Sequence, residues 1–304
     1  MYPLRSLPEP PARLWRVAYG LCEMPEGDTI YRTAEKLRRE LAGRVVTSFE
    51  SQLPQLTRVD QDAPIAGRTV IDVRAVGKHL LIELSGDLVL RTHLRMHGAW
   101  HVYRPGEKWR RGRQHMRIVL GTTSSVAVGF DLPVAELLDS RALARCSDLS
   151  RLGPDLLAEP FDAAEAAARL KQRPGMLVGD ALLDQTVMAG IGNVFKSETL
   201  FVCRINPLVP VAELANQQLE TLVRTARELL ARNARPAQRG GRGPIWFRQT
   251  TRSLDPSARL WVYCRTGKPC RRCGTPIVSR LHGSGTRRSY WCPKCQRQTR
   301  DPGL

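Results

Sequence analysis

The stretch Cys270-Arg-Arg-Cys273-Gly-Thr-Pro-Ile277, with its continuation Tyr290-Trp-Cys292-Pro-Lys-Cys295, is the most informative part of this sequence. Its cysteines follow the pattern Cys-x2-Cys-x18-Cys-x2-Cys. Two such turns bring paired thiolates to one tetrahedral zinc ion, and the residues between them can form a β-hairpin. Cysteine fills all four ligand positions, which leaves no open position for catalysis. The sequence therefore predicts one structural Zn²⁺, held by Cys270, Cys273, Cys292 and Cys295 in a zinc finger.

Positive charge is concentrated around this finger. The 304 residues contain 47 Lys and Arg against 29 Asp and Glu, a net charge of +18. From Arg232 to Leu304 the count is 17 minus 2, or +15, so the first 231 residues carry only 30 minus 27, or +3. Aromatic residues interleave with these arginines, which suits contacts to phosphates and stacking on bases: Trp246, Phe247, Trp261, Tyr263, Tyr290 and Trp291. The pattern favours nucleic acid over a membrane surface, although a solvated basic face is the alternative for charge alone.

The cellular compartment follows from the remaining cysteines and the N-terminus. Cys22, Cys146, Cys203 and Cys264 are scattered, which argues against a disulfide framework. Residues 1–23 contain four prolines and lack the continuous apolar segment of a secretory signal. No apolar run reaches the roughly 18 residues that a membrane helix requires. We expect a cytoplasmic, nucleoid-associated protein that does not bind membranes.

The first half of the chain has the pattern of a β-sandwich. Asp28 is expected to cap a helix whose apolar face carries Ile30, Ala34, Leu37 and Leu41 and which ends at Gly43. Short apolar runs with a period of two residues then predict strands: 45–49, 70–76, 79–84, 88–94, 100–103, 115–120 and 125–131. A helix followed by many antiparallel strands indicates a sandwich with flanking helices.

The second half has helical spacing. Predicted helices cover 133–139, 163–171, 177–183, 194–202 and 212–232, and Arg235 to Pro244 is a glycine-rich basic connector. The predicted fold class is therefore α+β. The predicted parts are a leader or misplaced translation start (1–23), a β-sandwich catalytic domain (24–132), a helical domain with the connector (133–244), and the zinc-finger segment (245–304).

Two further motifs are ambiguous on their own. Ala189-Gly190-Ile191-Gly192-Asn193 joins two helical segments, and the amides that begin the second helix can bind a phosphate, but structural glycines in a helical hairpin explain it equally well. His93, His97 and His101 recur every four residues, a spacing that would align metal ligands on a helix. Strand character on both sides makes this spacing accidental, so no second metal site is predicted.

The segment Met24-Pro25-Glu26-Gly27-Asp28 indicates a catalytic role only if translation starts at Met24. Removal of Met24 would leave Pro25 with a free secondary amine. Such an amine can attack an electrophilic sugar carbon and form an iminium ion, and an α-amino pKa of about 8 leaves some free base near neutrality. A peptide-bonded proline nitrogen cannot do this.

Five motifs in order resemble the formamidopyrimidine-DNA glycosylase/endonuclease VIII family of base-excision repair enzymes, across residues 24 to 296. They are Pro-Glu-Gly-Asp-Thr at 25–29, Gly-Lys-His-Leu-Leu at 77–81, His-Leu-Arg-Met-His-Gly at 93–98, the Gly-Ile-Gly-Asn turn at 190–193, and the four-cysteine finger. The Pro-Glu-Gly-Asp-Thr motif and the spacing of the motifs are most similar to those of the actinobacterial endonuclease VIII-like branch. The resemblance implies a helix–two-turn–helix element around Asn193.

The resemblance also implies roles for single residues. Pro25 corresponds to the nucleophile that attacks C1′ of the damaged nucleotide, and Glu26 to the carboxylate that moves protons during opening of the sugar ring. Lys78 corresponds to the lysine that contacts the flanking phosphates and assists acid catalysis. Asn193 and the finger-loop Arg287 correspond to residues that bind the same phosphates, which suits a nucleotide held out of the base stack.

These assignments have simpler alternatives. Lys78 alone is equally a charge at a strand edge, Glu26 a helix-end carboxylate, and Arg287 has Arg288 beside it. Met96 and His97 are the candidates for filling the gap left by the flipped base, and Leu132 is a further candidate wedge.

The implied activity is that of a bifunctional DNA glycosylase and abasic-site lyase, a monomer that acts on damaged DNA by β,δ-elimination. The sequence departs from the oxoguanine-type enzymes at two places, and the second departure favours oxidised pyrimidines over purines. Thr29 replaces the second acidic residue of the oxoguanine-type Pro-Glu-Leu-Pro-Glu motif, and Phe130-Asp131-Leu132-Pro133 stands where those enzymes carry Asp-Pro-Arg-Arg-Phe-Gly. The alternatives are an oxidised-purine glycosylase of the same family, or a non-catalytic zinc-finger DNA-binding member if the leader is retained.

Overall fold

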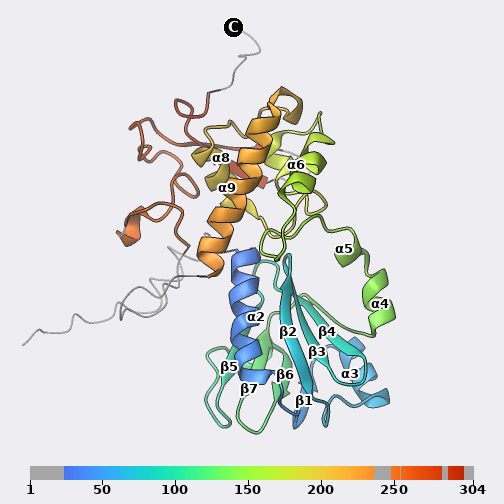
Figure 1. The fold of residues 1–304 in the computed structure, drawn as a ribbon. Helices are drawn as coiled ribbons and strands as arrows, with labels where there is room; N and C mark the ends of the chain where they lie inside the picture. The colour runs from blue at the N-terminus through green and yellow to red at the C-terminus, as the bar shows by residue number, and fades with distance from the viewer. Residues whose placement is uncertain (1–23, 236–247, 254, 283–286, 298–304) are drawn as a thin grey trace, which may run out of the picture.

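The computed structural model describes residues 24–235, 248–253, 255–282 and 287–297. In Figure 1 a β-sandwich lies below a helical layer, and helix α2 (Gly27–Leu41) runs along the sandwich toward α9 (Asn216–Ala234). The predicted leader and residues 236–244 of the predicted connector, together with Trp246 and Phe247, lie outside the described residues. Within the described residues, no helix has the length and apolar character needed to cross a membrane.

The N-terminal part is a sandwich of two four-stranded antiparallel sheets. One sheet has the order β1-β6-β7-β5 and the other β2-β3-β4-β8. The strands are β1 (Ser48–Ser51), β2 (Val70–Val76), β3 (His79–Leu84), β4 (Leu88–His93), β5 (Ala99–Tyr103), β6 (Met116–Gly121), β7 (Val126–Phe130) and β8 (Val134–Leu138). The apolar face of α2 packs into the core between the sheets, which confirms the predicted sandwich with flanking helices.

Three sequence predictions for this part were wrong. Residues 133–139, predicted as a helix, contain strand β8, which pairs with β4 so that Glu136 lies opposite Arg91 in a 2.8 Å ion pair. This cross-strand pairing outweighs the helical propensity of Ala, Glu and Leu. Asp28 is not the cap of α2, because the helix begins one residue earlier and Glu26 stands at the cap position. Strand β1 lies at 48–51 rather than 45–49, and Val45 makes only an isolated bridge to Thr69.

Three short helices of this part were not predicted. Helix α3 (Pro54–Asp62) follows β1, whereas α4 (Ser140–Arg145) and α5 (Ser147–Ser150) follow β8 and lead to the helical domain. Each is too short for a clear period of 3.6 residues.

The helical domain contains α6 (Ala163–Lys171), α7 (Val178–Ala181), α8 (Asn193–Val202) and α9, around a second hydrophobic core. All four coincide with predicted helices to within a few residues. Helix α8 is almost wholly buried, and Phe195 and Leu200 are among the residues that pack it into this core. Short 3-10 helices occupy Arg113–His115, Val211–Glu213 and Pro256–Ala258.

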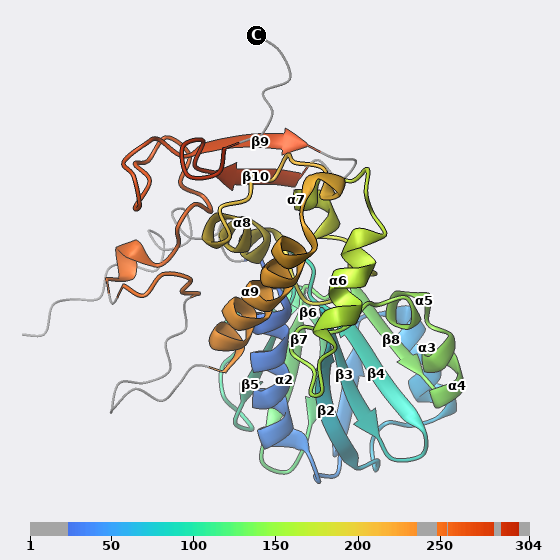
Figure 2. The same ribbon diagram turned by 45° about the horizontal axis from the view of Figure 1, so that its top comes forward.

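The C-terminal finger packs against α8 through strand β10 (Figure 2). Strands β9 (Val278–His282) and β10 (Arg287–Trp291) form the predicted antiparallel hairpin. Gln296 anchors the finger: its side-chain amide donates to the carbonyl of Ile205 at 2.8 Å, and its backbone carbonyl accepts from Asn206 at 3.0 Å. The finger is therefore fixed to the helical domain by buried polar contacts.

Candidate active site and metal centre

A cavity of about 480 Å³ opens where the start of α2, the β2–β3 turn, the turn before α8 and strand β10 meet. The structure brings together six of the residues predicted from the sequence at this cavity: Pro25, Glu26, Lys78, Met96, Asn193 and Arg287. They come from both domains and from the finger, although up to 262 residues separate them in the chain (287 minus 25). Only the tertiary fold creates this cluster.

Glu26 is buried at the N-terminus of α8. Its carboxylate accepts backbone N–H groups from Gly192 (3.0 Å), Val194 (2.7 Å) and Phe195 (3.2 Å), which are groups that the first turn of a helix leaves without partners. A Cβ atom on Gly192 would lie 2.4 Å from the Glu26 side chain, so only glycine fits there. The carboxylate thus joins the sandwich to the helical domain while it lines the cavity.

Lys78 lies in the tight turn between β2 and β3. Gly77, with a φ of 57°, forms that turn, and its N–H donates to the buried carboxylate of Asp155 at 2.6 Å. Burial, together with the nearby cations Arg287 and Arg248, lowers the pKa of Lys78 to about 8, although Glu26 opposes the shift. Lys78 therefore carries its charge below about pH 8.

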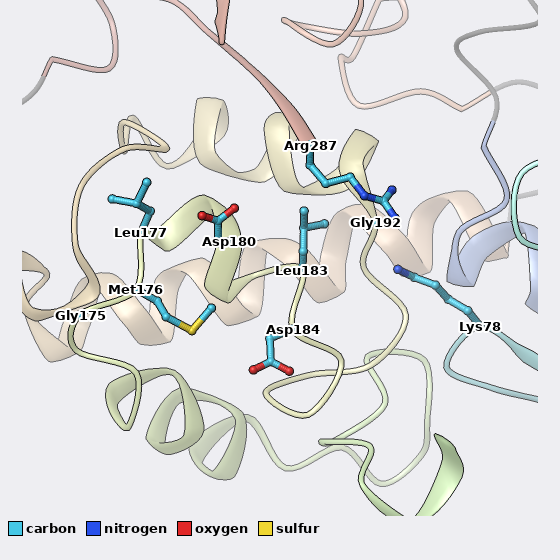
Figure 3. A pocket seen from close by; sticks show the side chains of 9 residues that line it. All are labelled: Lys78, Gly175, Met176, Leu177, Asp180, Leu183, Asp184, Gly192 and Arg287. Atoms are coloured by element: carbon cyan, nitrogen blue, oxygen red, sulfur yellow. The ribbon is translucent and has the colours of Figure 1, made fainter. Parts of the chain in front are cut away.

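A second cavity of about 490 Å³ adjoins the first (Figure 3). The side chains of Lys78 and Arg287 point toward each other beside Gly192, whereas Asp180 and Asp184 lie farther along the cavity. The two cations thus stand at the junction of both cavities. Such a pair of donors suits an anionic group such as a phosphate.

Asn193 is the first residue of α8, and its side chain reaches the finger. The Nδ2 atom donates to the backbone carbonyl of Arg288 in β10 at 2.9 Å, and Oδ1 accepts from the ammonium of Lys196 at 2.6 Å. Sequence reasoning missed Lys196. The sequence signal was weak, because this lysine stands next to the polar residues Ser197, Glu198 and Thr199 in Val-Phe-Lys-Ser-Glu-Thr-Leu-Phe.

The candidate gap-filling residues are placed differently from one another. Met96 is 51% exposed and lines the rim of the main cavity. His97 is exposed and is not among the lining residues; its carbonyl accepts from Arg111 at 3.0 Å. Leu132 is 2% exposed and packs in the sandwich core, so it is not a wedge in this structure.

A further group of lining residues was also missed by the sequence reasoning. His79 and His93 lie edge to face, with ring centroids 4.8 Å apart, and burial lowers their pKa values to about 3 and about 4. The buried guanidinium of Arg91 lies 3.1 Å from Nδ1 of His79 and 3.2 Å from the carboxylate of Asp148. Neutral imidazoles on this wall are the physical result of burial beside cations.

Asp28 and Thr29 occupy the positions where the sequence departs from the oxoguanine-type motif. The Asp28 carboxylate forms a buried two-point ion pair with Arg248, at 2.9 Å and 2.8 Å, and the same guanidinium donates to the hydroxyl of Thr29 at 2.9 Å. These residues therefore join the start of α2 to the segment before the finger.

The four predicted zinc ligands converge in the finger. The sulfur atoms of Cys270, Cys273, Cys292 and Cys295 all lie within 4.8 Å of one another, close to the roughly 3.8 Å expected for a tetrahedron with 2.3 Å zinc–sulfur bonds. Burial and the neighbouring sulfurs raise the pKa of Cys295 to about 12, a shift that a bound cation reverses. The residues fit a four-thiolate metal centre. Within the described ranges, His93, His97 and His101 form no such cluster.

Family models match both domains. The model of the formamidopyrimidine-DNA glycosylase N-terminal domain matches residues 24–146, and the model of the corresponding H2TH domain matches residues 152–241. A solved structure of formamidopyrimidine-DNA glycosylase from Lactococcus lactis, bound to DNA that contains an AP site, has a TM-score of 0.74 at 22% identity. It covers 90% of this chain and 100% of that chain, which confirms the fold.

Curated relatives are more similar in sequence. A probable endonuclease 8 2 from Streptomyces coelicolor is 42% identical over 279 residues, covering 90% of this chain and 94% of its own. The DNA-(apurinic or apyrimidinic site) lyase Nei2 from Mycolicibacterium smegmatis is 38% identical over 276 residues, covering 90% and 99%. With its sandwich, H2TH domain and four-cysteine finger, the chain belongs to the formamidopyrimidine-DNA glycosylase/endonuclease VIII family of DNA glycosylases and abasic-site lyases.

Proposed function

We propose that this protein excises oxidised bases from DNA, with a preference for pyrimidines, through a Schiff base on the nitrogen of Pro25. The observation that carries the proposal is the cavity in which Pro25 and Glu26 face Lys78, Asn193 and Arg287. It holds a nucleophile position, a carboxylate and two cations within one space, which is what cleavage of a glycosidic bond between flanking phosphates requires.

The proposed sequence of steps uses these groups in turn. The lone pair of the Pro25 nitrogen forms a bond to C1′ as the damaged base leaves with its bonding electrons, and ring opening gives an iminium ion. The iminium withdraws electrons, so the C2′ proton is lost and the 3′-phosphate departs. A second elimination releases the 5′-phosphate, and water hydrolyses the remaining iminium to an unsaturated aldehyde and the free Pro25 amine. Glu26 transfers protons at the sugar oxygen.

The phosphates flanking the lesion are assigned to Lys78, Asn193 and Arg287. The convergence of Lys78 and Arg287 beside Gly192 (Figure 3) supports this assignment, because two cations with a helix N-terminus attract an oxyanion. We assign the four cysteines to one structural Zn²⁺, which would hold the hairpin that carries Arg287. Damaged DNA is the proposed partner, and the proposed active form is a nucleoid-associated monomer.

The lesion preference rests on the connection between β7 and β8. Phe130 and Leu132 are both buried, and Asp131 is held by Arg111 at 2.9 Å and His115 at 2.9 Å. The short connection therefore projects no loop with which to read the base opposite the lesion. Excision rates on duplexes with thymine glycol, dihydrouracil or 8-oxoguanine test the preference; faster excision of 8-oxoguanine would overturn it.

Borohydride reduction in the presence of abasic-site DNA tests the chemistry, because it converts a Schiff base into a stable adduct. Protein that begins at Pro25 should be trapped, and a Pro25→Ala variant should not. The 304-residue chain has an amide at this nitrogen and should give no adduct there. Absence of an adduct with the Pro25-terminated protein would instead favour a non-catalytic DNA-binding role.

A further inference from the structure

Lys196 is a buried cation that the proposed chemistry does not use. Its side chain is 0% exposed within α8. Among the residues that the structure describes, its ammonium has two hydrogen-bond acceptors, Oδ1 of Asn193 at 2.6 Å and the carbonyl of Arg288 at 3.4 Å, and no carboxylate within 4 Å. A buried ammonium without a carboxylate partner lowers the free energy of unfolding. An apolar side chain of similar length would fill the same space without this desolvation cost.

The contact with Asn193 has a specific consequence. An ammonium is only a donor, so the end of the Asn193 amide that meets it must be the oxygen. The NH₂ end then faces β10, where it donates to the carbonyl of Arg288 at 2.9 Å, and the hydroxyl of Tyr263 is a further partner of this amide. Lys196 and the Arg288 carbonyl thereby together fix which end of Asn193 faces the finger.

We propose that Lys196 is a positioning residue that, through Asn193 and the Arg288 carbonyl, fastens the start of α8 to β10 and so holds Arg287 of that strand at the phosphate site. The proposal rests on the proposed function, in which Asn193 and Arg287 bind one phosphate group. Without the ammonium, Asn193 Oδ1 loses its donor and the Arg288 carbonyl loses its contact with Lys196, so β10 and Arg287 are held less firmly. The inference extends the phosphate site to a residue with no path of its own to the DNA.

The charge of Lys196 responds to its surroundings on three sides. Burial, with a smaller contribution from Arg287 of β10, lowers its pKa to about 7, although Asp180 of α7 and Glu26 before α2 oppose the shift. The ammonium is therefore present below about pH 7 and is progressively lost above it. The benefit that Lys196 gives to DNA binding should shrink as the pH rises from 6 to 8.5.

A double-mutant cycle on the 304-residue chain tests the proposal, with a duplex that carries a tetrahydrofuran abasic-site analogue as the probe. Lys196→Met should raise the dissociation constant about tenfold or more at pH 6, the loss expected for one hydrogen bond to an anion. In an Asn193→Ala background the same change should have no further effect, because the two residues act through one contact. Lys196→Arg should restore part of the affinity.

The controls separate this role from folding and from general charge. Lys171→Met removes an exposed lysine of α6 and should leave binding within about twofold. The ratio between wild type and Lys196→Met should fall toward one at pH 8.5, and effects of Lys78 common to both proteins cancel in it. If Lys196→Met does not fold, Lys196→Gln keeps a polar side chain without the charge and should weaken binding in the same direction.

The proposal is overturned if Lys196→Met binds like the wild type, if the two substitutions are additive, or if Asn193→Ala alone leaves binding unchanged. A loss of affinity that is independent of pH would also overturn it, since that result indicates packing alone. These outcomes are independent of the Schiff-base test, because they concern binding and leave the Pro25 nitrogen untouched.

Discussion

Glu26 and Glu198 are two buried carboxylates with the same type of partner and different surroundings. Glu26 accepts three backbone N–H groups at the start of α8, and Glu198, within α8, accepts those of Trp261 (2.8 Å), Val262 (2.9 Å) and Tyr263 (2.9 Å), besides the hydroxyl of Thr250. Glu26 lines the main cavity, whereas Glu198 lines none of the cavities described above.

The difference shows that the location of a carboxylate, rather than its hydrogen bonding, marks it as a candidate for catalysis. Both side chains join separate parts of the chain: Glu26 joins the sandwich to the H2TH domain, and Glu198 joins α8 to the segment before the finger. Burial raises the pKa of Glu198, although its donors oppose the shift. Only Glu26 has a substrate-sized space beside it.

Substitution of each glutamate by glutamine should give the largest difference, and the difference should lie in the rate of base excision. Glu26→Gln should lower the rate of base excision by about 10² to 10⁴, the contribution typical of a positioned proton-transfer group. Glu198→Gln should leave the rate per folded molecule within about threefold. Single-turnover excision with the Pro25-terminated proteins measures both rates. Equal losses in the two variants would remove the distinction between the carboxylates.

For the stability of the fold, in contrast, Glu198 should be the important carboxylate. Glu198→Ala leaves three backbone N–H groups without their acceptor in a fully buried setting, each at a cost of about 1–3 kcal/mol. We expect a loss of at least about 3 kcal/mol in the free energy of unfolding. Urea titration followed by circular dichroism measures it. A loss below about 1 kcal/mol would show that water or other groups replace the carboxylate.

Removal of the metal should affect the finger more than the sandwich. The apolar cluster of the finger is small and includes all four cysteines, so chelation should unfold the finger and weaken DNA binding by at least about tenfold. Cys273→Ser should have the same effect, and Cys203→Ser, outside the finger, serves as the matched control. Metal analysis with binding assays measures both. Undiminished binding by metal-free protein would contradict a structural role for the centre.

The smallest predicted effect concerns pH and Lys78. Its pKa of about 8 means that the cation is present below pH 8 and is lost as the pH rises above that value. DNA affinity should therefore fall by less than about tenfold between pH 8 and pH 9. Lys78→Arg keeps its charge throughout this range and should remove that dependence. An unchanged pH dependence in Lys78→Arg would show that another group controls it.

Local patterns were sufficient for much of the fold. The period-two runs predicted the strands now seen as β2, β3 and β4, and the cysteine spacing predicted the hairpin of the finger. Strand β8 could not be predicted this way, because Val-Ala-Glu-Leu-Leu favours a helix until pairing with β4 and the Arg91–Glu136 contact decide otherwise.

The candidate site was only partly visible in the sequence. Motif resemblance selected Pro25 and Lys78, which the structure brings to one cavity. It did not select Lys196 or Arg91, because each depends on contacts with residues distant in the chain. Leu132 was misjudged for a similar reason, since packing in the sandwich core leaves it only 2% exposed.

The central claim is that the nitrogen of Pro25 forms the covalent bond to DNA. Mass spectrometry of the borohydride-trapped complex, after proteolysis of the Pro25-terminated protein, tests it most directly. We predict one modified peptide, with the deoxyribose fragment attached to the Pro25 nitrogen. An adduct on a lysine side chain such as Lys78, or the absence of any adduct while bases are still excised, would contradict this account.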